Sequence, residues 1–220
     1  MDIDRPPDIV VIAGGAPVDA QRVASVSDST RVIAADAGVT AALVLGWRVD
    51  VAVGDFDSLR SDDLAHLDEI ADEVRRFPAD KDATDLELAL CVAAESSPSR
   101  VLVAGIEGGR PDHALANLLL AASDRFAALD VEVVVAEGRA WVVRDQLTGA
   151  LPVGSLVSVI PVHGPAQVSI SGVRWPLDRR TLPAGTTLAV SNEVAAHPFT
   201  LDVHDGVVVC IAPRNSEEHQ

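Results

Sequence analysis

From the N-terminus to about residue 137, short runs of apolar residues alternate with longer amphipathic segments. Uninterrupted apolar runs are typical of strands buried on both faces of a parallel sheet, and they occupy residues 9–13, 31–35, 51–53, 100–104 and 131–135. Helices are expected at residues 17–27, 39–45, 61–71, 84–94 and 111–122, and one more strand at 74–77. This alternation predicts a doubly wound α/β domain with a mainly parallel sheet.

After about residue 140 the helical periodicity disappears, and short strand-like runs separated by Gly and Pro take its place. These runs are residues 140–143, 156–162, 167–170, 187–190, 200–203 and 207–211. Their spacing predicts a small all-β domain, built as a sandwich or a partial barrel. We therefore expect an α/β domain at residues 1–140, followed by an all-β domain at residues 141–220.

Polar or glycine-containing loops follow four of the predicted strands, at Gly14, Asp36, Asp55 and Gly105. Ligands of open α/β sheets bind at the carboxyl ends of the strands, and parallel strands bring those ends to the same edge. The sequence therefore predicts that these four loops meet in one site.

Two acidic segments belong to this predicted site: Gly54-Asp55-Phe56-Asp57-Ser58 and Asp80-Lys81-Asp82-Ala83-Thr84-Asp85. Carboxylates that lie this close together raise one another's pKa unless a cation is present. Aspartate oxygens without Cys or paired His nearby suit a hard ion, and we expect Mg²⁺. Two alternatives stay open: the Asp55/Asp57 pair could serve only turn chemistry, or Asp55 could be a nucleophile, since a strand followed by DxD also resembles the haloacid-dehalogenase phosphatases.

The remaining polar candidates each have a functional and a structural interpretation. Lys81 is the single lysine of the chain. Either it remains by chance in a composition that favours arginine, or its ammonium group binds a phosphate. The glycine loop that ends in Arg110 either approaches phosphates, with Arg110 as a clamp, or makes a tight turn. His113 and Asn117 lie one helical turn apart on the same face. They either contact the ligand or are ordinary polar residues of a helix. Thr84 and Glu87 fit a capping box at the start of the helix that follows the second acidic segment, residues 80–85.

Charge and composition narrow the function classes. A net charge of −16 argues against nucleic-acid binding, which needs a basic surface, and a polyanionic substrate would have to enter with its metal. Cys91 and Cys210 have no metal-binding spacing and are interpreted as core thiols. The N-terminus lacks the pattern of a signal peptide, and no apolar run approaches the roughly 20 residues of a membrane span. We expect a cytoplasmic protein.

Taken together, the motifs resemble those of the thiamine pyrophosphokinase family, in the same order along the chain. They are Asp36-Ala37-Gly38, the two acidic segments, the stretch Gly105-x-x-Gly108-Gly109-Arg110-x-Asp112-His113-x-x-x-Asn117, and, in the C-terminal half, Gly172-Val173-Arg174-Trp175-Pro176-Leu177 and Ser191-Asn192-Glu193. The resemblance extends from about residue 9 to 211. One departure is Ala37, where the family usually has glycine.

The resemblance implies transfer of the diphosphoryl group of ATP to the hydroxyl group of thiamine, giving thiamine diphosphate and AMP. It also implies a homodimer with the site at the subunit interface. Asp55, Asp57 and Asp85 would hold Mg²⁺ and, with Lys81, form the catalytic set. The nucleotide side would comprise Asp36, Ser58, Asp82, Thr84, Arg110, Asp112, His113 and Asn117. A non-catalytic protein that binds thiamine or nucleotide on the same fold is the alternative.

Thiamine itself would be held by Trp175, Ser191 and Asn192. The Trp175 ring offers a cation–π contact to the thiazolium, and Ser191 and Asn192 offer hydrogen bonds to the aminopyrimidine. Core packing is the competing interpretation for Trp175, and it is the interpretation we adopt for Trp47 and Trp141.

Overall fold

The computed structural model describes residues 1–108, 110–135 and 137–213, which divide into two compact units. The first, called here the α/β unit, comprises residues 6–120 and Val133–Val135. The second, the β unit, comprises Met1–Arg5, Ala121–Glu132 and the described residues from 137 onward. The mixed sheet with helices and the separate all-strand region both agree with the sequence prediction.

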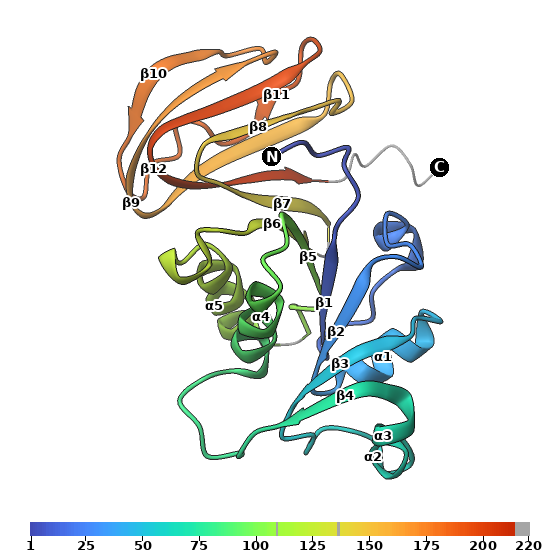
Figure 1. Ribbon diagram of the computed structural model, residues 1–220. Helices are drawn as coiled ribbons and strands as arrows, with labels where there is room; N and C mark the ends of the chain where they lie inside the picture. The colour runs from blue at the N-terminus through green and yellow to red at the C-terminus, as the bar shows by residue number, and fades with distance from the viewer. Residues whose placement is uncertain (109, 136, 214–220) are drawn as a thin grey trace. The chain divides into compact units, whose positions relative to one another are not determined.

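Five strands of the α/β unit pair in parallel in the order β5–β1–β2–β3–β4 (Figure 1). Their bounds are Ile9–Ala13 for β1, Arg31–Ala35 for β2, Val49–Gly54 for β3, Ala71–Arg76 for β4 and Arg100–Ala104 for β5. The last three residues of β6 (Asp130–Val135) also belong to this unit. Because Ile12 pairs with both Ala34 and Ala104, the strands end level with one another and their loops share one edge.

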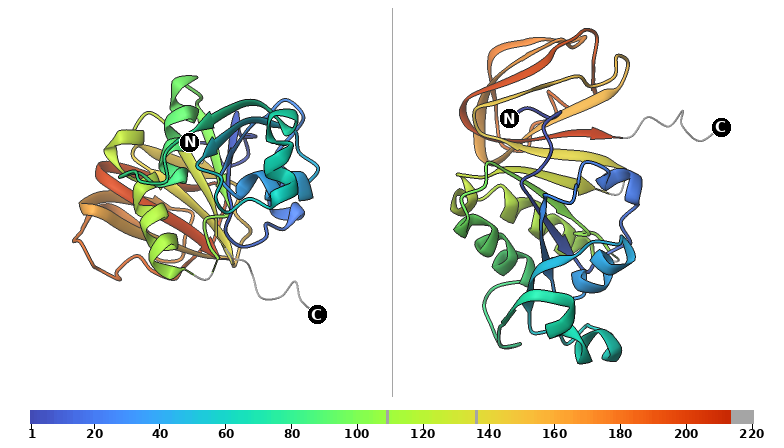
Figure 2. Two further views of the ribbon diagram at one scale, coloured as in Figure 1. Left: turned by 90° about the horizontal axis from the view of Figure 1, so that it is seen from below. Right: turned by 45° about the vertical axis from the view of Figure 1, so that its right-hand side comes forward.

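Helices cover both faces of this sheet (Figures 1 and 2). Val10 and Ile12 of β1 are buried in one cluster with Val39 and Ala42 of α1 (Gly38–Val44). Successive side chains of a strand point to opposite faces, so Val11 points to the face on which α4 (Asp85–Glu95) packs. Each fully buried Val, Ile or Leu of such a core contributes roughly 1.5–3 kcal/mol to folding.

The short helices of the α/β unit differ from the sequence prediction. Only a 3₁₀-helix, η1 (Ala20–Val23), forms within the predicted helix 17–27, since it has a single buried side chain, that of Val23. The predicted helix 61–71 is two helices, α2 (Ser61–Ala65) and α3 (Leu67–Ile70), because the backbone of His66 leaves the helical region between them. Strand β4 starts at Ala71 instead of 74, because it pairs with β3 from Ala71 onward. The last helix, α5, spans Pro111–Ala121.

The β unit is antiparallel and is organised around two long strands, β9 (Leu156–Ser171) and β12 (Phe199–Pro213). Strand β12 also pairs with β7 (Gly138–Val143) and β8 (Gln146–Gly149), and β9 pairs with β10 (Leu177–Leu182) and β11 (Asn192–Glu193). Burial alternates in both halves of β9, but the phase changes in the middle: Val157, Val159 and Pro161 are buried before it, and Ala166, Val168 and Ile170 after it. The core of the β unit contains Trp141, as expected from the sequence. A 3₁₀-helix, η2, spans Asp124–Phe126.

Three sequence predictions for the β unit were wrong in detail. The runs 156–162 and 167–170 are one strand, as are 200–203 and 207–211, because strands can continue through Gly and Pro where a partner strand is available. Residues 187–190 form a turn closed by the Val190 N–H donating to the Thr187 carbonyl. Strands β8 and β10 were missed because they contain few apolar residues, Leu147 in β8 and Leu177 and Leu182 in β10.

Neither cysteine forms a disulfide; Cys210 is buried and Cys91 is half-buried in α4. Trp47 is partly buried against the core of the α/β unit, as expected. Within the described ranges, no helix is both long enough and apolar enough to cross a membrane.

Candidate active site

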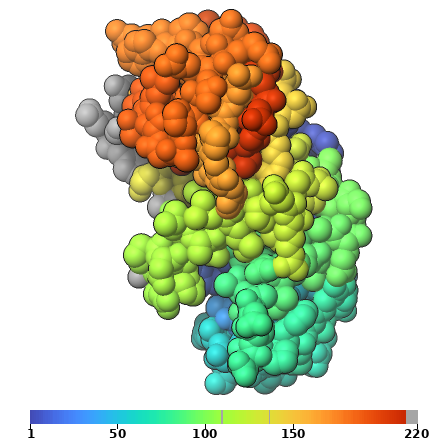
Figure 3. All heavy atoms as spheres, turned by 90° about the vertical axis from the view of Figure 1, so that its left-hand side faces the viewer, coloured from blue at the N-terminus to red at the C-terminus, as the bar shows by residue number. Residues whose placement is uncertain are grey.

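A pocket of about 500 Å³ lies at the carboxyl edge of the parallel sheet, within the α/β unit. Its walls include the loops that follow β1, β2, β3 and β5, as the sequence predicts. In the space-filling view the surface is hollowed between α5 and the segment that leads into α4 (Figure 3). Ten of the predicted site residues line it: Asp36, Asp55, Asp57, Ser58, Lys81, Thr84, Asp85, Arg110, His113 and Asn117.

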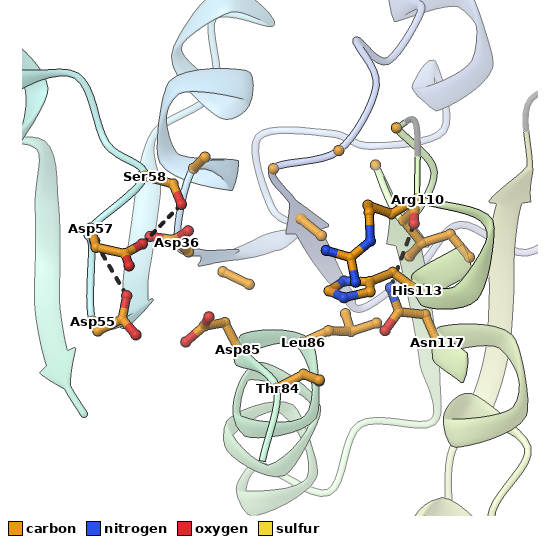
Figure 4. Close-up of a pocket in the computed structure, with 18 of the residues that line it drawn as sticks. Asp36, Asp55, Asp57, Ser58, Thr84, Asp85, Leu86, Arg110, His113 and Asn117 are labelled. Carbon is orange, nitrogen blue, oxygen red and sulfur yellow. Dashed lines mark hydrogen bonds between the residues drawn. The ribbon is translucent and has the colours of Figure 1, made fainter. Parts of the chain in front are cut away.

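Three carboxylates converge on one side of this pocket (Figure 4). Asp36, Asp55 and Asp57 each offer an oxygen, and these oxygens lie within 4.8 Å of one another. The Oδ1 atom of Asp36 is buried and has no hydrogen-bond partner in the described part of the chain. A buried carboxylate oxygen without a partner is costly, and a divalent cation would satisfy it. The donor set and its geometry therefore fit a hard metal ion.

The backbone of this acidic loop is held in an unusual conformation. Phe56 has a φ of 63° and Asp36 a φ of 49°, both in the left-handed region that side chains with a Cβ rarely adopt. The ring of Phe56 is 1% exposed, and Arg76 covers it with its guanidinium carbon 5.3 Å from the ring centroid. The buried ring thus anchors the loop while the carboxylates on either side of it line the pocket.

Turn chemistry is present in the same loop. Asp55 Oδ1 accepts a hydrogen bond from the Asp57 N–H at 3.2 Å, and the Ser58 hydroxyl donates to Asp57 Oδ1 at 2.9 Å. Since Asp55 has a second oxygen that faces Lys81, the turn and a metal site are compatible. The two interpretations of the Asp55/Asp57 pair therefore do not exclude each other.

Lys81 is paired with two of the site's carboxylates. Its Nζ atom lies 2.8 Å from Asp55 Oδ2 and 3.2 Å from Asp85 Oδ1. The hydrogen bond from Lys81 lowers the pKa of Asp55 below its ordinary value. Burial by itself lowers the pKa of Lys81, but hydrogen bonds to Asp55 and Asp85 outweigh it and raise that pKa. At Asp85 burial outweighs the attraction of Lys81, so the pKa of this carboxyl is raised.

Asp85 is placed by the start of α4. The Thr84 hydroxyl oxygen caps the helix by accepting from the Glu87 N–H at 3.2 Å, as the capping-box pattern predicts. Asp85 is the first residue of the helix and its Oδ1 atom is buried. The amino end of α4, with its partial positive charge, therefore faces the pocket together with the acidic loop.

Residues of α5 and the loop before it form the opposite wall (Figure 4). Arg110, His113 and Asn117 line the pocket there. Arg110 donates two hydrogen bonds to Asp112, from Nε to Oδ1 at 3.0 Å and from Nη2 to Oδ2 at 2.7 Å. Arg110 thereby holds the pKa of Asp112 well below its usual range. Asn117 donates a long 3.5 Å hydrogen bond to the Ile106 carbonyl.

The glycines of the pocket floor have a packing reason. Gly105 has a φ of 72°, and a Cβ there would lie 2.3 Å from the Ala13 carbonyl oxygen. The Gly15 N–H donates to the Gly105 carbonyl at 2.9 Å, which joins the loops after β1 and β5. Gly14 makes room for Ala37, because a Cβ on Gly14 would lie 2.4 Å from the Ala37 methyl. Gly109, which belongs to the predicted glycine loop, lies outside the described residues.

Two predicted nucleotide residues do not line the pocket: Asp82 and Asp112 are exposed, and Asp112 reaches the site only through Arg110. The sequence assigned Asp36 to the nucleotide, whereas the structure places it with Asp55 and Asp57. Glu107 also lines the pocket and was not singled out. Its position in the glycine loop that follows a predicted strand could have identified it as a pocket residue.

Trp175, Ser191 and Asn192 belong to the β unit. Trp175 is 55% exposed, so core packing does not account for it, and the Arg174 guanidinium carbon lies 4.9 Å from its ring centroid. Asn192 is buried, and its side-chain amide accepts a hydrogen bond from the Trp175 N–H and donates one to the Trp175 carbonyl. Ser191 is exposed, and its N–H donates to the Ser158 hydroxyl at 3.0 Å.

Comparison with known proteins identifies the family. Residues 24–133 match the model of the thiamin pyrophosphokinase catalytic domain, and residues 144–208 match that of the thiamin pyrophosphokinase vitamin B1 binding domain. The thiamine pyrophosphokinase of Bacillus subtilis strain 168 is 27% identical over 191 residues, which cover 81% of this chain and 85% of that protein.

Solved structures of named relatives share the fold. The crystal structure of thiamin pyrophosphokinase from Geobacillus thermodenitrificans has a TM-score of 0.81 at 28% identity, covering 95% of this chain and 98% of that one. The crystal structure of the Bacillus subtilis protein has a TM-score of 0.83 at 25% identity, covering 94% and 99%. With family models matched in both halves, the chain belongs to the thiamin pyrophosphokinase family.

Proposed function

We propose that the chain transfers the diphosphoryl group of ATP to the hydroxyl group of thiamine, giving thiamine diphosphate and AMP. The observation that carries this proposal is the convergence of Asp36, Asp55 and Asp57, with one buried oxygen left without a partner, beside the amino end of a helix. Diphosphoryl transfer depends mainly on positioning and on neutralising charge. A carboxylate set facing a helix terminus suits a metal-bound polyphosphate.

In this proposal Asp55, Asp57 and Asp85 hold Mg²⁺, and Asp36 joins them because its oxygen belongs to the same cluster. The ion, when bound, supplies neutralisation of the phosphate charge. Asp82 is exposed and does not line the pocket, and only the sequence motif assigns it to the nucleotide.

The opposite wall provides the contacts to the nucleotide. Arg110 orients the phosphates, and Asp112 holds its guanidinium plane by the bidentate pair. His113 and Asn117, on the same face of α5, bind the nucleoside. Ser58 and Thr84 act chiefly through the loop and the helix cap that they hold in place.

Thiamine binds on the β unit in this proposal. The exposed ring of Trp175 receives the thiazolium cation, a contact worth about 0.5–2 kcal/mol. Ser191 offers its hydroxyl to the aminopyrimidine. Asn192 acts indirectly, because its amide is engaged by the main chain of Trp175.

We also propose the finer features that the sequence implies. They are a doubly wound class for the α/β domain at residues 1–140, a sandwich or barrel class for the thiamine-binding domain at residues 141–220, and a homodimer with thiamine at the subunit interface. Exposed apolar side chains of the β unit, including Trp175, Leu188 and Val190, are surface that such an interface would cover. Two thiols outside any disulfide support a cytoplasmic location. Sedimentation velocity of the full chain tests the dimer.

The activity is tested by incubating the protein with ATP, Mg²⁺ and thiamine, and by measuring nucleotides and thiamine phosphates by chromatography. Equal amounts of AMP and thiamine diphosphate are expected, with none when thiamine or Mg²⁺ is omitted. Release of ADP, or thiamine binding without turnover, would contradict the proposal. The phosphatase alternative is not favoured, because both halves of the chain match models of thiamin pyrophosphokinase domains.

A further inference from the structure

The ammonium group of Lys81 occupies the place of a cation in the acidic site. It lies 2.8 Å from Asp55 Oδ2 and 3.2 Å from Asp85 Oδ1, and its side chain is 14% exposed. Asp55 and Asp85 are two of the four carboxylates that we assign to Mg²⁺. An ammonium and a divalent ion that share two carboxylates compete for them, because each neutralises the charge that attracts the other.

Lys81 is carried by a segment that can release it. The residues between the end of β4 at Arg76 and the start of α4 at Asp85 have no helix or strand, and Asp80 and Asp82 on either side of Lys81 are exposed. A lysine side chain has four methylene groups, so its charge can move several ångströms while the backbone stays in place.

We propose that Lys81 is the internal counter-ion of the metal-free site, and that a divalent cation displaces its ammonium from Asp55 and Asp85. This inference rests on the metal site of the proposed function and deepens it. The displaced ammonium stays at the pocket wall, where it is available to an incoming phosphate. Loading of the cation therefore switches Lys81 from a partner of carboxylates to a partner of the polyphosphate, and binding of the two ligands becomes mutually favourable.

The single lysine allows a direct test on the unmodified full chain. Biosynthetic labelling with ¹³Cε-lysine yields one lysine signal in the NMR spectrum, and that signal belongs to Lys81. Titration with Mg²⁺ in the absence of nucleotide is expected to shift and sharpen this signal. The midpoint is expected to coincide with that of cation binding, measured separately from the displacement of Mn²⁺ by Mg²⁺ in electron paramagnetic resonance.

Charge variants separate displacement from general electrostatics. Lys81→Met is expected to bind Mn²⁺ about 5- to 100-fold more tightly than the unchanged protein, within the usual range of coupling between two ligands. Arg110→Met removes the same charge from the opposite wall of the same pocket, where Arg110 is already paired with Asp112. Its Mn²⁺ affinity is expected to change by no more than about twofold, since exposed and separated charges are screened.

The outcomes distinguish this inference from the proposed function. Cation binding with an unmoved Lys81 signal, or equal gains in affinity for Lys81→Met and Arg110→Met, overturns the displacement and leaves the metal site intact. Absence of cation binding overturns both the displacement and the metal site. If Lys81→Met does not fold, the NMR titration of the unchanged protein decides the question.

Discussion

The side-chain amide of Asn192 forms two hydrogen bonds with the main chain of Trp175. Its Oδ1 atom accepts from the Trp175 N–H at 3.1 Å, and its Nδ2 atom donates to the Trp175 carbonyl at 2.8 Å. Oδ1 also accepts from the Glu193 N–H at 2.9 Å, so three hydrogen bonds hold the side-chain amide of this buried residue. Asn192 therefore fixes the segment that presents Trp175. A direct contact of Asn192 with thiamine stays a prediction from the sequence.

Asn192→Ala is expected to lower the free energy of unfolding by about 1–3 kcal/mol, because it leaves main-chain groups of Trp175 without partners. It is also expected to raise the KM for thiamine more than the KM for ATP. Urea denaturation and initial rates measure the two effects. Ser191→Ala, at an exposed neighbour, is the matched control and is expected to stay within about 0.5 kcal/mol of the unchanged protein. Equal destabilisation by both substitutions would contradict the positioning role.

Trp175→Leu tests the exposed ring itself. Loss of a cation–π contact of about 0.5–2 kcal/mol corresponds to a two- to thirtyfold increase in the KM for thiamine. Stability is expected to change little, since the ring is 55% exposed. Trp175→Phe retains an aromatic face and is expected to recover part of the affinity. An unchanged KM in Trp175→Leu would show that thiamine does not contact this ring.

The sequence predicted the parallel sheet and the meeting of its four loops because apolar runs and loop positions are local patterns. It placed Asp55, Asp57 and Asp85 near one another for the same reason. It could not show that Asp36 joins the carboxylate cluster, because that depends on the pairing of β2 with β3 and on the left-handed backbone of Asp36. Nor could it separate a ligand contact from a structural one at Asn192.

The β unit shows a second limit of sequence patterns. Polar strands such as β10 carry little hydrophobic signal, and they form because β9 offers them a hydrogen-bonding partner. In contrast, the apolar run at residues 187–190 forms a turn, although the Ala189 carbonyl accepts a hydrogen bond from the Val159 N–H of β9 at 2.9 Å. Hydrogen bonding between distant segments therefore determines which residues of the β unit form strands, and local composition does not show it.

Thr84→Ala is expected to reduce the free energy of unfolding by about 0.5–2 kcal/mol, because it removes the cap that accepts from the Glu87 N–H. The same loss would loosen the first turn of α4, which carries Asp85. Thr84→Ser keeps a capping hydroxyl and is expected to match the unchanged protein. Chemical denaturation of the three proteins measures this, and a similar loss in Thr84→Ser would argue for packing of the threonine methyl instead.

Cys210 provides a pH prediction away from the site. Burial raises the pKa of its thiol well above the ordinary value of 9.0. Below about pH 8 the thiol is almost entirely neutral in both states, so it adds almost no pH dependence. Above that pH the unfolded chain loses the proton and the folded chain keeps it, so stability falls as pH rises, by at most about 1.4 kcal/mol per pH unit.

The Cys210→Ala variant should lack that alkaline contribution. Its unfolding free energy, compared with that of the unchanged protein, is expected to differ by a constant amount from pH 6 to 8. The difference is then expected to shrink between pH 9 and 10.5. Parallel curves over the whole range would indicate that the folded thiol ionises as readily as the unfolded one.

Asp57 offers the sharpest separation of function from folding. It is exposed, and its oxygen lies within 4.8 Å of those of Asp36 and Asp55. Asp57→Asn keeps an acceptor for the Ser58 hydroxyl while removing one negative charge from the cluster. Turnover is expected to fall about a hundredfold or more, as is typical when a group that stabilises transition-state charge is lost.

The metal-free Asp57→Asn protein is expected to melt at the same temperature as the unchanged chain or higher, because carboxylate repulsion is relieved. AMP formation measures turnover, and thermal unfolding in the presence of a chelator measures stability. Asp62→Asn removes an exposed charge from α2, outside the pocket, and is expected to change neither. A metal-free melting temperature that falls in Asp57→Asn but not in Asp62→Asn would assign Asp57 to the fold, since a ligand of an absent ion has no stabilising contact to lose.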